Sequence, residues 1–180
     1  EVDAAAALQA AVEATTSDEE PVQLEALRQL QATDFTPEIA RAVRHLVESS
    51  SERVRLSSLP VMAERGKARV LPTLVAHAEK RHASLSTTEA EVTGRALATS
   101  SPRGALDTFK GWLELKGGGL LGRKTLPAPA TVQRVALAGL ERIGGEEADE
   151  LLLRLAELGE DEVAAEADVV IDRRKGASGG

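Results

Sequence analysis

The 180-residue sequence contains no cysteine and very few aromatic side chains. Without cysteine, neither a disulfide bond nor a thiolate metal site can form. Phe35, Phe109 and Trp112 are the only aromatic residues, so a hydrophobic core has to be built from Leu, Val, Ile and Ala. The apolar runs are much shorter than the about 20 residues that a membrane-spanning helix needs. We therefore expect no membrane contact and, because cysteine is absent, we interpret the protein as cytoplasmic.

The residues that are abundant favour helices. Ala, Leu, Glu and Arg dominate, and all four are strong helix formers. β-branched residues occur singly rather than in the alternating runs that are typical of strands. The length is that of one ordinary domain. We predict a single all-α domain over residues 1–175 and a disordered tail at 176–180. Since the sequence starts at Glu1 with neither Met nor a leader-like segment, we interpret it as a fragment of a longer protein.

A nine-residue pattern, Val-x-Leu-x-small-Leu-x-x-aliphatic, recurs along the chain. It begins at Val22, Val54 and Val135, more weakly at Val163, and in a degenerate form at Glu89. Successive copies start 32, 35, 46 and 28 residues apart. Each copy predicts a helix with a wide apolar stripe, and a second apolar helix follows each of the first four copies. A period of this size with two helices per copy is typical of solenoids.

Capping residues, Gly and Pro divide the chain into short helices. Ser17 and Glu20 form a capping-box pattern, and Ser101 before a proline opens another helix. Pro60 falls inside a predicted helix and should kink it. The Gly- and Pro-rich segment 116–129 predicts a flexible loop that accounts for the longest spacing between copies. We expect helices at 2–15, 19–31, 37–49, 52–65, 69–82, 87–99, 102–115, 129–143, 146–158 and 161–174.

Two segments resemble a known repeat family. Residues 51–59, Ser-Glu-Arg-Val-Arg-Leu-Ser-Ser-Leu, resemble the acidic-x-x-Val-Arg-x-x-Ala-x-x-Leu start of helix A in HEAT repeats. Residues 144–152, Gly-Gly-Glu-Glu-Ala-Asp-Glu-Leu-Leu, resemble the turn into helix B. The chain thus resembles bacterial HEAT-repeat (HEAT-like, armadillo-type) proteins. This resemblance implies a right-handed α-α superhelix, or solenoid, of antiparallel helix pairs whose B helices line a concave, protein-binding face. It brings no catalytic centre with it.

Charge is distributed unevenly along the chain, whose net charge is −7. Residues 1–40 hold 1 basic and 9 acidic side chains, residues 41–124 hold 15 and 8, and residues 125–180 hold 6 and 12. Charge runs usually do no more than solubilise a helix face. In a linear stack, however, this order would place a basic centre between acidic ends.

The polar sides of the predicted B helices supply the candidate partner-binding residues. In the helix at 37–49, burial of the apolar stripe turns the basic side chains outward. The same phase in the next two B helices turns the basic side chains and His77 outward. Trp112 could anchor a partner, although the scarcity of aromatics favours a position in the core. The candidate residues are Arg41, Arg44, His45, His77, Lys80, Arg81, Lys110 and Trp112.

No arrangement of residues indicates catalysis. His45, His77 and His82 lie in no metal-binding or nucleophile motif. Acidic pairs such as Glu146-Glu147 are explained by their position at a helix N-terminus. The triplet of glycines at 117–119 lacks the Gly-Lys-Ser/Thr end of a phosphate-binding loop. We predict neither an enzyme, nor a cofactor, nor a metal site.

These observations favour a non-catalytic protein–protein interaction scaffold, monomeric by itself, that binds an acidic protein partner. The alternative is a nucleic-acid-binding helical-repeat module that uses the central basic strip on phosphates, but the net acidity and the few aromatics weigh against it. A third possibility is a HEAT-like lyase that attaches a chromophore. The aromatic and polar pocket residues that such a ligand needs are scarce.

Overall fold

The structure is a computed structural model that describes residues 4–115 and 126–177, and every regular element within these ranges is a helix. The prediction of an all-α chain is therefore confirmed. Within the same ranges, no helix combines the length and the apolar character needed to cross a membrane. The elements are α1 (Ala4–Ala14), α2 (Glu20–Gln31), α3 (Pro37–Val47), α4 (Glu52–Gly66), a 3-10 turn η1 (Lys67–Val70), α5 (Leu71–Arg81), α6 (Thr87–Ser100), α7 (Pro102–Trp112), α8 (Ala130–Ile143), α9 (Glu146–Leu158) and α10 (Asp161–Ala177).

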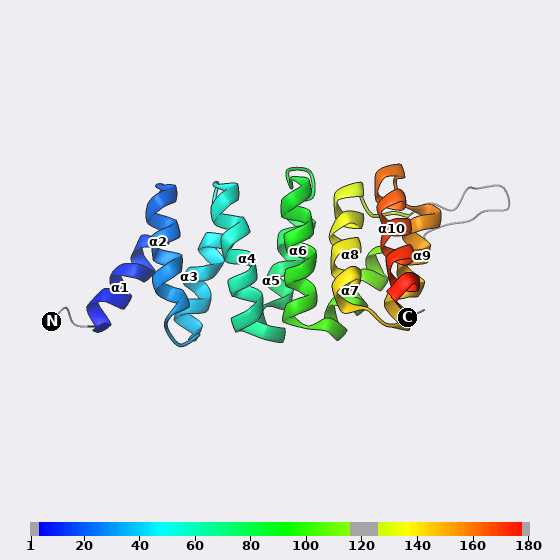
Figure 1. The fold of residues 1–180 in the computed structure, drawn as a ribbon. Helices are drawn as coiled ribbons and strands as arrows, with labels where there is room; N and C mark the ends of the chain where they lie inside the picture. The colour runs from blue at the N-terminus through cyan, green and yellow to red at the C-terminus, as the bar shows by residue number, and fades with distance from the viewer. Residues whose placement is uncertain (1–3, 116–125, 178–180) are drawn as a thin grey trace.

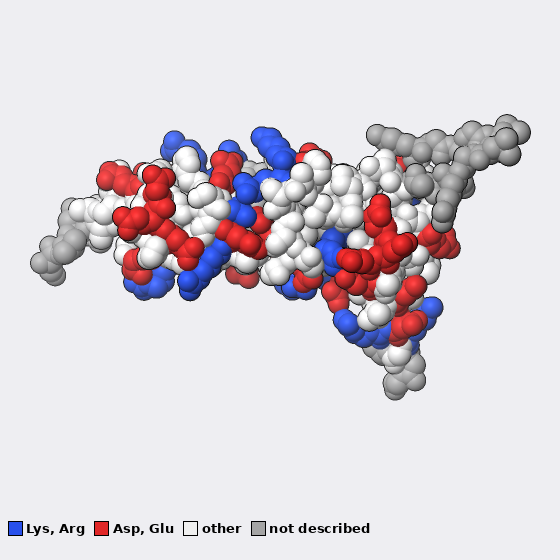
Figure 2. Space-filling view, turned by 90° about the horizontal axis from the view of Figure 1, so that it is seen from above, with Lys and Arg blue, Asp and Glu red and all other residues white. Residues whose placement is uncertain are grey.

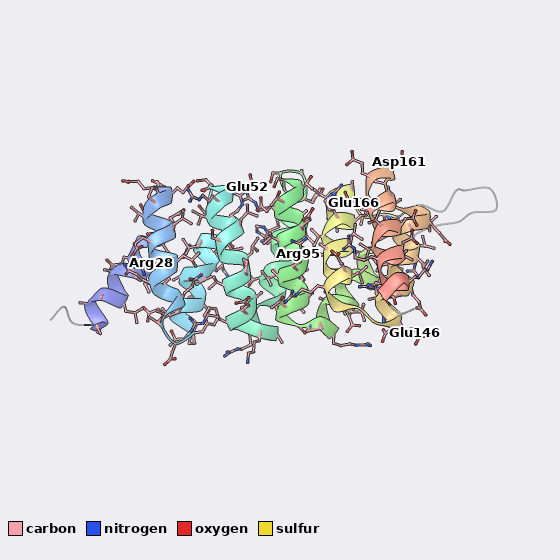
Figure 3. The ribbon with its side chains drawn as sticks, viewed as in Figure 1. Arg28, Glu52, Arg95, Glu146, Asp161 and Glu166 are labelled. Carbon is pink, nitrogen blue, oxygen red and sulfur yellow. The ribbon has the colours of Figure 1, made fainter. Side chains whose placement is uncertain are left out.

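The helices form two rows (Figure 1). The front row consists of α2, α4, α6, α8 and α10, and the back row of α3, α5, α7 and α9; α1 stands at the end next to α2. Glu52 and Asp161, in the first turns of α4 and α10, lie at the upper ends of their helices, whereas Glu146 of α9 lies at the lower end (Figure 3). The back-row helix α9 therefore runs opposite to these front-row helices.

The five copies of the repeated pattern all lie on the front row, on α2, α4, α6, α8 and α10. Val54, Leu59 and Met62 of the second copy are buried in the core. Val22 is the exception at the first position of a copy, with 36% of its surface exposed, because only α1 packs beyond α2. The pattern thus marks the helices whose apolar stripes face the interior between the two rows.

Hydroxyl caps explain where several helices begin. Thr36, Ser51, Ser86 and Ser101 each accept a hydrogen bond from the backbone N–H three residues ahead, which satisfies an otherwise unpaired donor of the first turn. Most helix boundaries fall within about two residues of the predicted ones, the usual uncertainty at helix ends. The predicted helix at 102–115 ends earlier, at Trp112. The predicted helix at 69–82 begins as the 3-10 turn η1.

A close crossing joins α6 and α8 in the front row. A Cβ atom added to Gly94 would lie 2.1 Å from the carbonyl oxygen of Val135, which belongs to the backbone of α8. On α8, a Cβ atom added to Gly139 would lie 3.0 Å from the carbonyl oxygen of Gly94 on α6, and 2.3 Å from Cζ of Phe109 on α7. Only glycine leaves enough room at both positions, so the two helices pack backbone to backbone there.

The end of the chain differs from the expectation. The predicted disordered tail at 176–180 is wrong for its first two residues, because α10 continues to Ala177. Nη2 of Arg174 donates to the carbonyl oxygens of Leu140 and Glu141, at 2.7 and 2.9 Å, and ties the last turns of α10 to the end of α8. Residues 178–180 lie outside the described ranges. So do residues 116–125 of the predicted loop, and residues 126–129 contain no helix.

Candidate functional site

A groove runs between the back-row helices α3 and α5. Its lining residues recur every three or four positions along each helix, singly or as adjacent pairs, and this spacing places them on one helical face. The groove has a volume of about 570 Å³, and we call it the back groove; it is lined by Arg44, Val47, Glu48, Pro72, Thr73, Ala76, His77, Lys80 and Arg81.

A second, smaller hollow adjoins the back groove at Arg44. It has a volume of about 270 Å³ and lies between the start of α3 and the turn from α4 to η1. We call it the side hollow; it is lined by Phe35, Thr36, Pro37, Ala40, Arg41, Arg44, Met62, Gly66, Arg69 and Val70. The two hollows together contain five cationic side chains, Arg41, Arg44, Arg69, Lys80 and Arg81, and one carboxylate, Glu48.

The cations of the two hollows have no acidic partner within residues 4–115 and 126–177. Arg44 is the only one of them that makes a side-chain hydrogen bond to a described residue: its Nη2 donates to the hydroxyl of Thr73 at 2.7 Å. Thr73 is neutral, so this bond joins α3 to α5 but compensates no charge. The hollows therefore hold a net positive charge that an anion from outside can reach.

Two buried nitrogen atoms near the back groove are unsatisfied. Nε of Arg81 and Nε2 of His77 are shielded from solvent and make no hydrogen bond to any described residue. An unpaired buried donor costs about 1–3 kcal/mol. Arg81 is only half-buried as a whole, and it lines the groove.

His77 does not point outward as expected. Only 6% of its surface is exposed, and its ring forms part of the floor of the back groove. Its Nε2 lies 3.2 Å from Oε1 of Glu89 on α6, without the alignment of a hydrogen bond. The expectation was wrong because α5 packs against α6, so a position on the polar side of the helix faces a buried carboxylate instead of water.

That carboxylate belongs to a buried ion pair. Glu89, with none of its surface exposed, accepts from Nε of Arg55 at 2.6 Å and from Nη2 at 2.8 Å. Nη1 of Arg55 donates to the carbonyl oxygens of Ser49 and Ser50, both at 2.8 Å. Burial by itself raises the pKa of Glu89, but the two hydrogen bonds from Arg55 and the nearby His77 outweigh it and lower the pKa from 4.5 to about 2. The hydrogen bonds to Glu89 likewise raise the pKa of Arg55.

The ion pair of Arg55 and Glu89 was not predicted from the sequence, although both residues belong to copies of the repeated pattern. Arg55 is the arginine of the Val-Arg pair in the second copy, and nothing in a single sequence shows that it is buried. Glu89 occupies the third position after Ser86, where a glutamate is typical of a capping box. Ser86 does accept from the N–H of Glu89, but the carboxylate of Glu89 turns to Arg55 instead of the helix start.

The remaining candidates lie elsewhere. His45 is exposed on α3 and lines neither hollow. Lys110 pairs with Glu147 of α9, as does Arg103 at 2.9 Å, and these hydrogen bonds lower the pKa of the Glu147 carboxyl. Trp112 is half-buried; its Nε1 donates to Oε1 of Glu79 at 3.0 Å, and its ring centroid lies 5.7 Å from that of Phe109. The structure thus gathers Arg41, Arg44, His77, Lys80 and Arg81 and leaves out the other three candidates.

A groove of about 340 Å³ on the front row provides a contrast. We call it the front groove; it lies over α6, α8 and α10 and is lined by Glu91, Arg95, Arg134, Leu137, Ala138, Glu141, Glu166, Val169, Val170 and Arg173. Each of its arginines has a carboxylate partner within the same lining: Arg95 with Glu91 at 3.1 Å, Arg134 with Glu166 at 2.5 Å, and Arg173 with Glu141 at 2.7 Å. The labelled Arg95 and Glu166 both lie on the front row (Figure 3).

The charged surface seen from above follows the order expected from the sequence only in part. Red Asp and Glu atoms gather over the α2 end and over the α8–α10 end, and blue Lys and Arg atoms lie between them, along the upper and lower edges, and also at the α8–α10 end (Figure 2). The acidic groups at the two ends include the first-turn residues Glu20, Asp161 and Glu162.

Among the described residues, no group of three or more His, Asp and Glu side chains is placed to hold a metal ion. Comparison of the chain with models of known protein families, with curated proteins and with solved structures finds no match.

Proposed function

We propose that the chain is a non-catalytic protein-binding array of HEAT-like repeats. In this proposal the helix pairs stack into a right-handed superhelix, and the back row forms the face that a partner occupies. Two observations support it: the front row carries the five copies of the repeated pattern, and the two rows are built from short helices that are joined by short connections everywhere except between α7 and α8.

The observation that carries the proposal is the difference in charge compensation between the front groove and the two hollows of the back row. The back groove and the side hollow contain five cations and one carboxylate, and none of the five has an acidic partner in the described part of the chain. Exposed hollows with uncompensated charge attract ligands of opposite charge and accelerate their association. A protein surface with acidic groups would complete the pairs that this chain leaves open.

Nucleic acid competes for the same cations, and the proposal ranks it second. Nucleic acid carries a charge on every nucleotide, so the net charge of −7 opposes its binding more than it opposes the binding of a short acidic protein segment. Single-stranded nucleic acid is usually held by aromatic side chains on which bases stack. Trp112 is half-buried and already bonded to Glu79, so it offers little surface for stacking.

Photo-crosslinking tests which face binds a partner. A photo-reactive amino acid replaces His45 on the back row in one variant and Val169 in the front groove in another, since both positions are exposed. In a lysate of the source organism, we expect a protein to crosslink from position 45 but not from position 169. Changing Arg41, Arg44, Lys80 and Arg81 to Glu should abolish that crosslink.

The proposal fails if crosslinks arise only from position 169, or if the four charge reversals leave crosslinking from position 45 unchanged. Removal of the crosslink by a nuclease would favour nucleic acid instead. Circular dichroism of each variant confirms that the helices are retained, so a loss of crosslinking can be assigned to the surface.

A further inference from the structure

We propose that the back groove and the side hollow hold a glutamate-rich segment of the partner protein, with one carboxylate at Arg81 and Lys80 and further carboxylates along Arg44 and Arg41. This inference rests on the proposed function and names the chemistry of the ligand. It starts from the fact that the cations come from two helices and one turn, with Arg41 and Arg44 on α3, Lys80 and Arg81 on α5, and Arg69 on η1.

In this proposal the strongest contact with the segment is made at the last turn of α5. Arg81 and Lys80 stand in the last turn of α5 and both line the back groove. Nε of Arg81 is buried and donates to no described acceptor, so a small rotation of this side chain toward an incoming carboxylate would satisfy it. A guanidinium binds a carboxylate through two parallel hydrogen bonds, which makes Arg81 the strongest single contact available.

The cations continue from the last turn of α5 toward the start of α3. Arg44 stands between the two hollows, because it lines both of them. Arg41 lies one helical turn before Arg44 on α3, and Arg69 lines the same side hollow from η1. A segment that extends from Arg81 past Arg44 therefore meets a cation at each step and only one carboxylate, Glu48.

The surroundings favour carboxylates over phosphate. Lys80, Arg81 and Arg44 stand in the last turns of α5 and α3, where the carbonyl ends of the helices are negative and oppose a doubly charged group. Phosphate sites usually gather several backbone N–H donors at a helix N-terminus. The first turn of α5 does line the back groove, through Pro72 and Thr73, but Pro72 has no N–H to donate. Singly charged carboxylates spread along the groove match the cations one to one.

The apolar part of the lining favours glutamate over aspartate. Val47, Pro72 and Ala76 lie among the charged residues of the back groove. The methylene groups of glutamate can cover such a surface while the carboxylate reaches a cation, as long charged side chains often do. Aspartate is too short to do both.

Peptide binding tests the inference on the purified chain. A fluorescent peptide that alternates Glu and Ala is titrated with the protein, and fluorescence anisotropy reports binding at low and at high salt. We expect binding that weakens with salt, while the matching Gln and Ala peptide does not bind. Arg44→Glu with Lys80→Glu should weaken binding by about tenfold or more, since charge pairs across an interface are lost and replaced by repulsion.

The chain offers a matched control pair. Arg142 and Lys175 are exposed, stand in the last turns of α8 and α10, and line none of the three grooves described above. Arg142→Glu with Lys175→Glu changes the net charge by the same amount. This control should bind the Glu peptide as the wild type does, to within about twofold, because distant surface charges are screened by salt.

Four results would overturn the inference: no binding of the Glu peptide, equal binding of the Gln peptide, equal weakening by the control pair, or tighter groove-dependent binding of a phosphoserine peptide or an RNA. Self-association through the acidic ends of a second copy would appear as a dimer in sedimentation. If Arg44→Glu with Lys80→Glu abolishes that dimer, the groove is occupied by a second copy of this chain and not by a segment of another protein.

The inference and the proposed function can fail separately. If a protein crosslinks from position 45 but no acidic peptide binds, the back row is a binding face and the glutamate-rich ligand is wrong. If the peptide binds as expected and no protein crosslinks, the groove recognises acidic segments and the role as a protein-binding array is wrong.

Discussion

The front groove and the back groove are each lined by three cationic side chains, but they differ in how the charges of these side chains are compensated. Three arginines of the front groove pair with three carboxylates of the same lining. The cations of the back groove have no described acidic partner. Exposed ion pairs contribute little to stability, so the pairs of the front groove mainly neutralise a surface. The number of cations on a helix face is therefore not enough to predict binding. It is also necessary to know which of them are already paired with a carboxylate of the same chain.

The largest loss of stability is expected when the buried ion pair of Arg55 and Glu89 is broken. Glu89→Gln keeps the shape of the side chain but leaves the charge of Arg55 buried without its partner. We expect the free energy of unfolding to fall by about 3–5 kcal/mol, as when one member of a buried ion pair is removed. Urea denaturation measures it. Glu25→Gln is the control, because Glu25 also has a pKa lowered to about 2, by hydrogen bonds from Arg28 and Gln29, but at an exposed site; its stability should stay unchanged.

The same pair predicts a pH dependence. Since the pKa of Glu89 is lower in the folded chain, about 2 instead of 4.5, its carboxylate stabilises the fold fully above pH 4.5 and progressively less as the pH falls toward 2. The difference in unfolding free energy between the wild type and Glu89→Gln should therefore be greatest near neutral pH and shrink through this window. A difference that stays constant down to pH 2 would show that Glu89 is not held as the ionised partner of Arg55.

The next largest loss of stability is expected at the close crossing of α6 and α8. Gly94→Ala places a methyl group against the backbone of α8, which cannot rotate away, so α6 and α8 have to separate. We expect a loss of about 1–3 kcal/mol, as in other overpacked cores, measured by thermal unfolding. Gly111→Ala on α7 is the control: nothing lies within 4 Å of the added Cβ, and the substitution should stabilise the helix. Equal effects at the two positions would contradict the close crossing.

A smaller effect is expected for an ion pair of the front groove itself. Arg134 has only 10% of its side chain exposed, and Glu166→Gln removes its shorter contact while Glu162 remains at 3.4 Å. We expect a loss of about 1 kcal/mol, because Glu166 is half-exposed and water can replace part of the interaction. Glu157→Gln on α9, an exposed carboxylate without a described partner, should have no effect on urea denaturation.

The smallest effect on stability is expected in the back groove. Arg44→Gln with Lys80→Gln removes two charges that no described carboxylate compensates and one hydrogen bond to Thr73. The free energy of unfolding should change by less than about 0.5 kcal/mol, as for most surface substitutions. If the free energy of unfolding fell as much as it does for Glu166→Gln, the contrast between the two grooves would be wrong, because the cations of the back groove would then stabilise the fold as well.

The helices could be predicted from the sequence because local signals specify them. Ser101 caps the helix that it was expected to open, and the apolar stripe of α3 is buried as predicted. The predicted capping box of Ser17 and Glu20 does not form, because Glu19 is the N-cap of α2 and makes no side-chain cap hydrogen bond. Burial at helix crossings could not be predicted. His77 and Glu89 lie on different helices, and their contact depends on how α5 packs against α6. Lys110 has the same local pattern as Lys80, yet only Lys110 meets a carboxylate, Glu147 of α9.

By itself, the sequence determined that this chain is helical, which segments form helices, and that its basic residues gather in the middle of the chain. These features depend on local propensity, capping and periodicity, which act over a few residues. Only the tertiary structure decided that Glu89 is buried against Arg55, that α6 and α8 meet at Gly94 and Gly139, and that the cations of the back groove have no described acidic partner. Pairing depends on distances between helices far apart in sequence, and no local pattern encodes those distances.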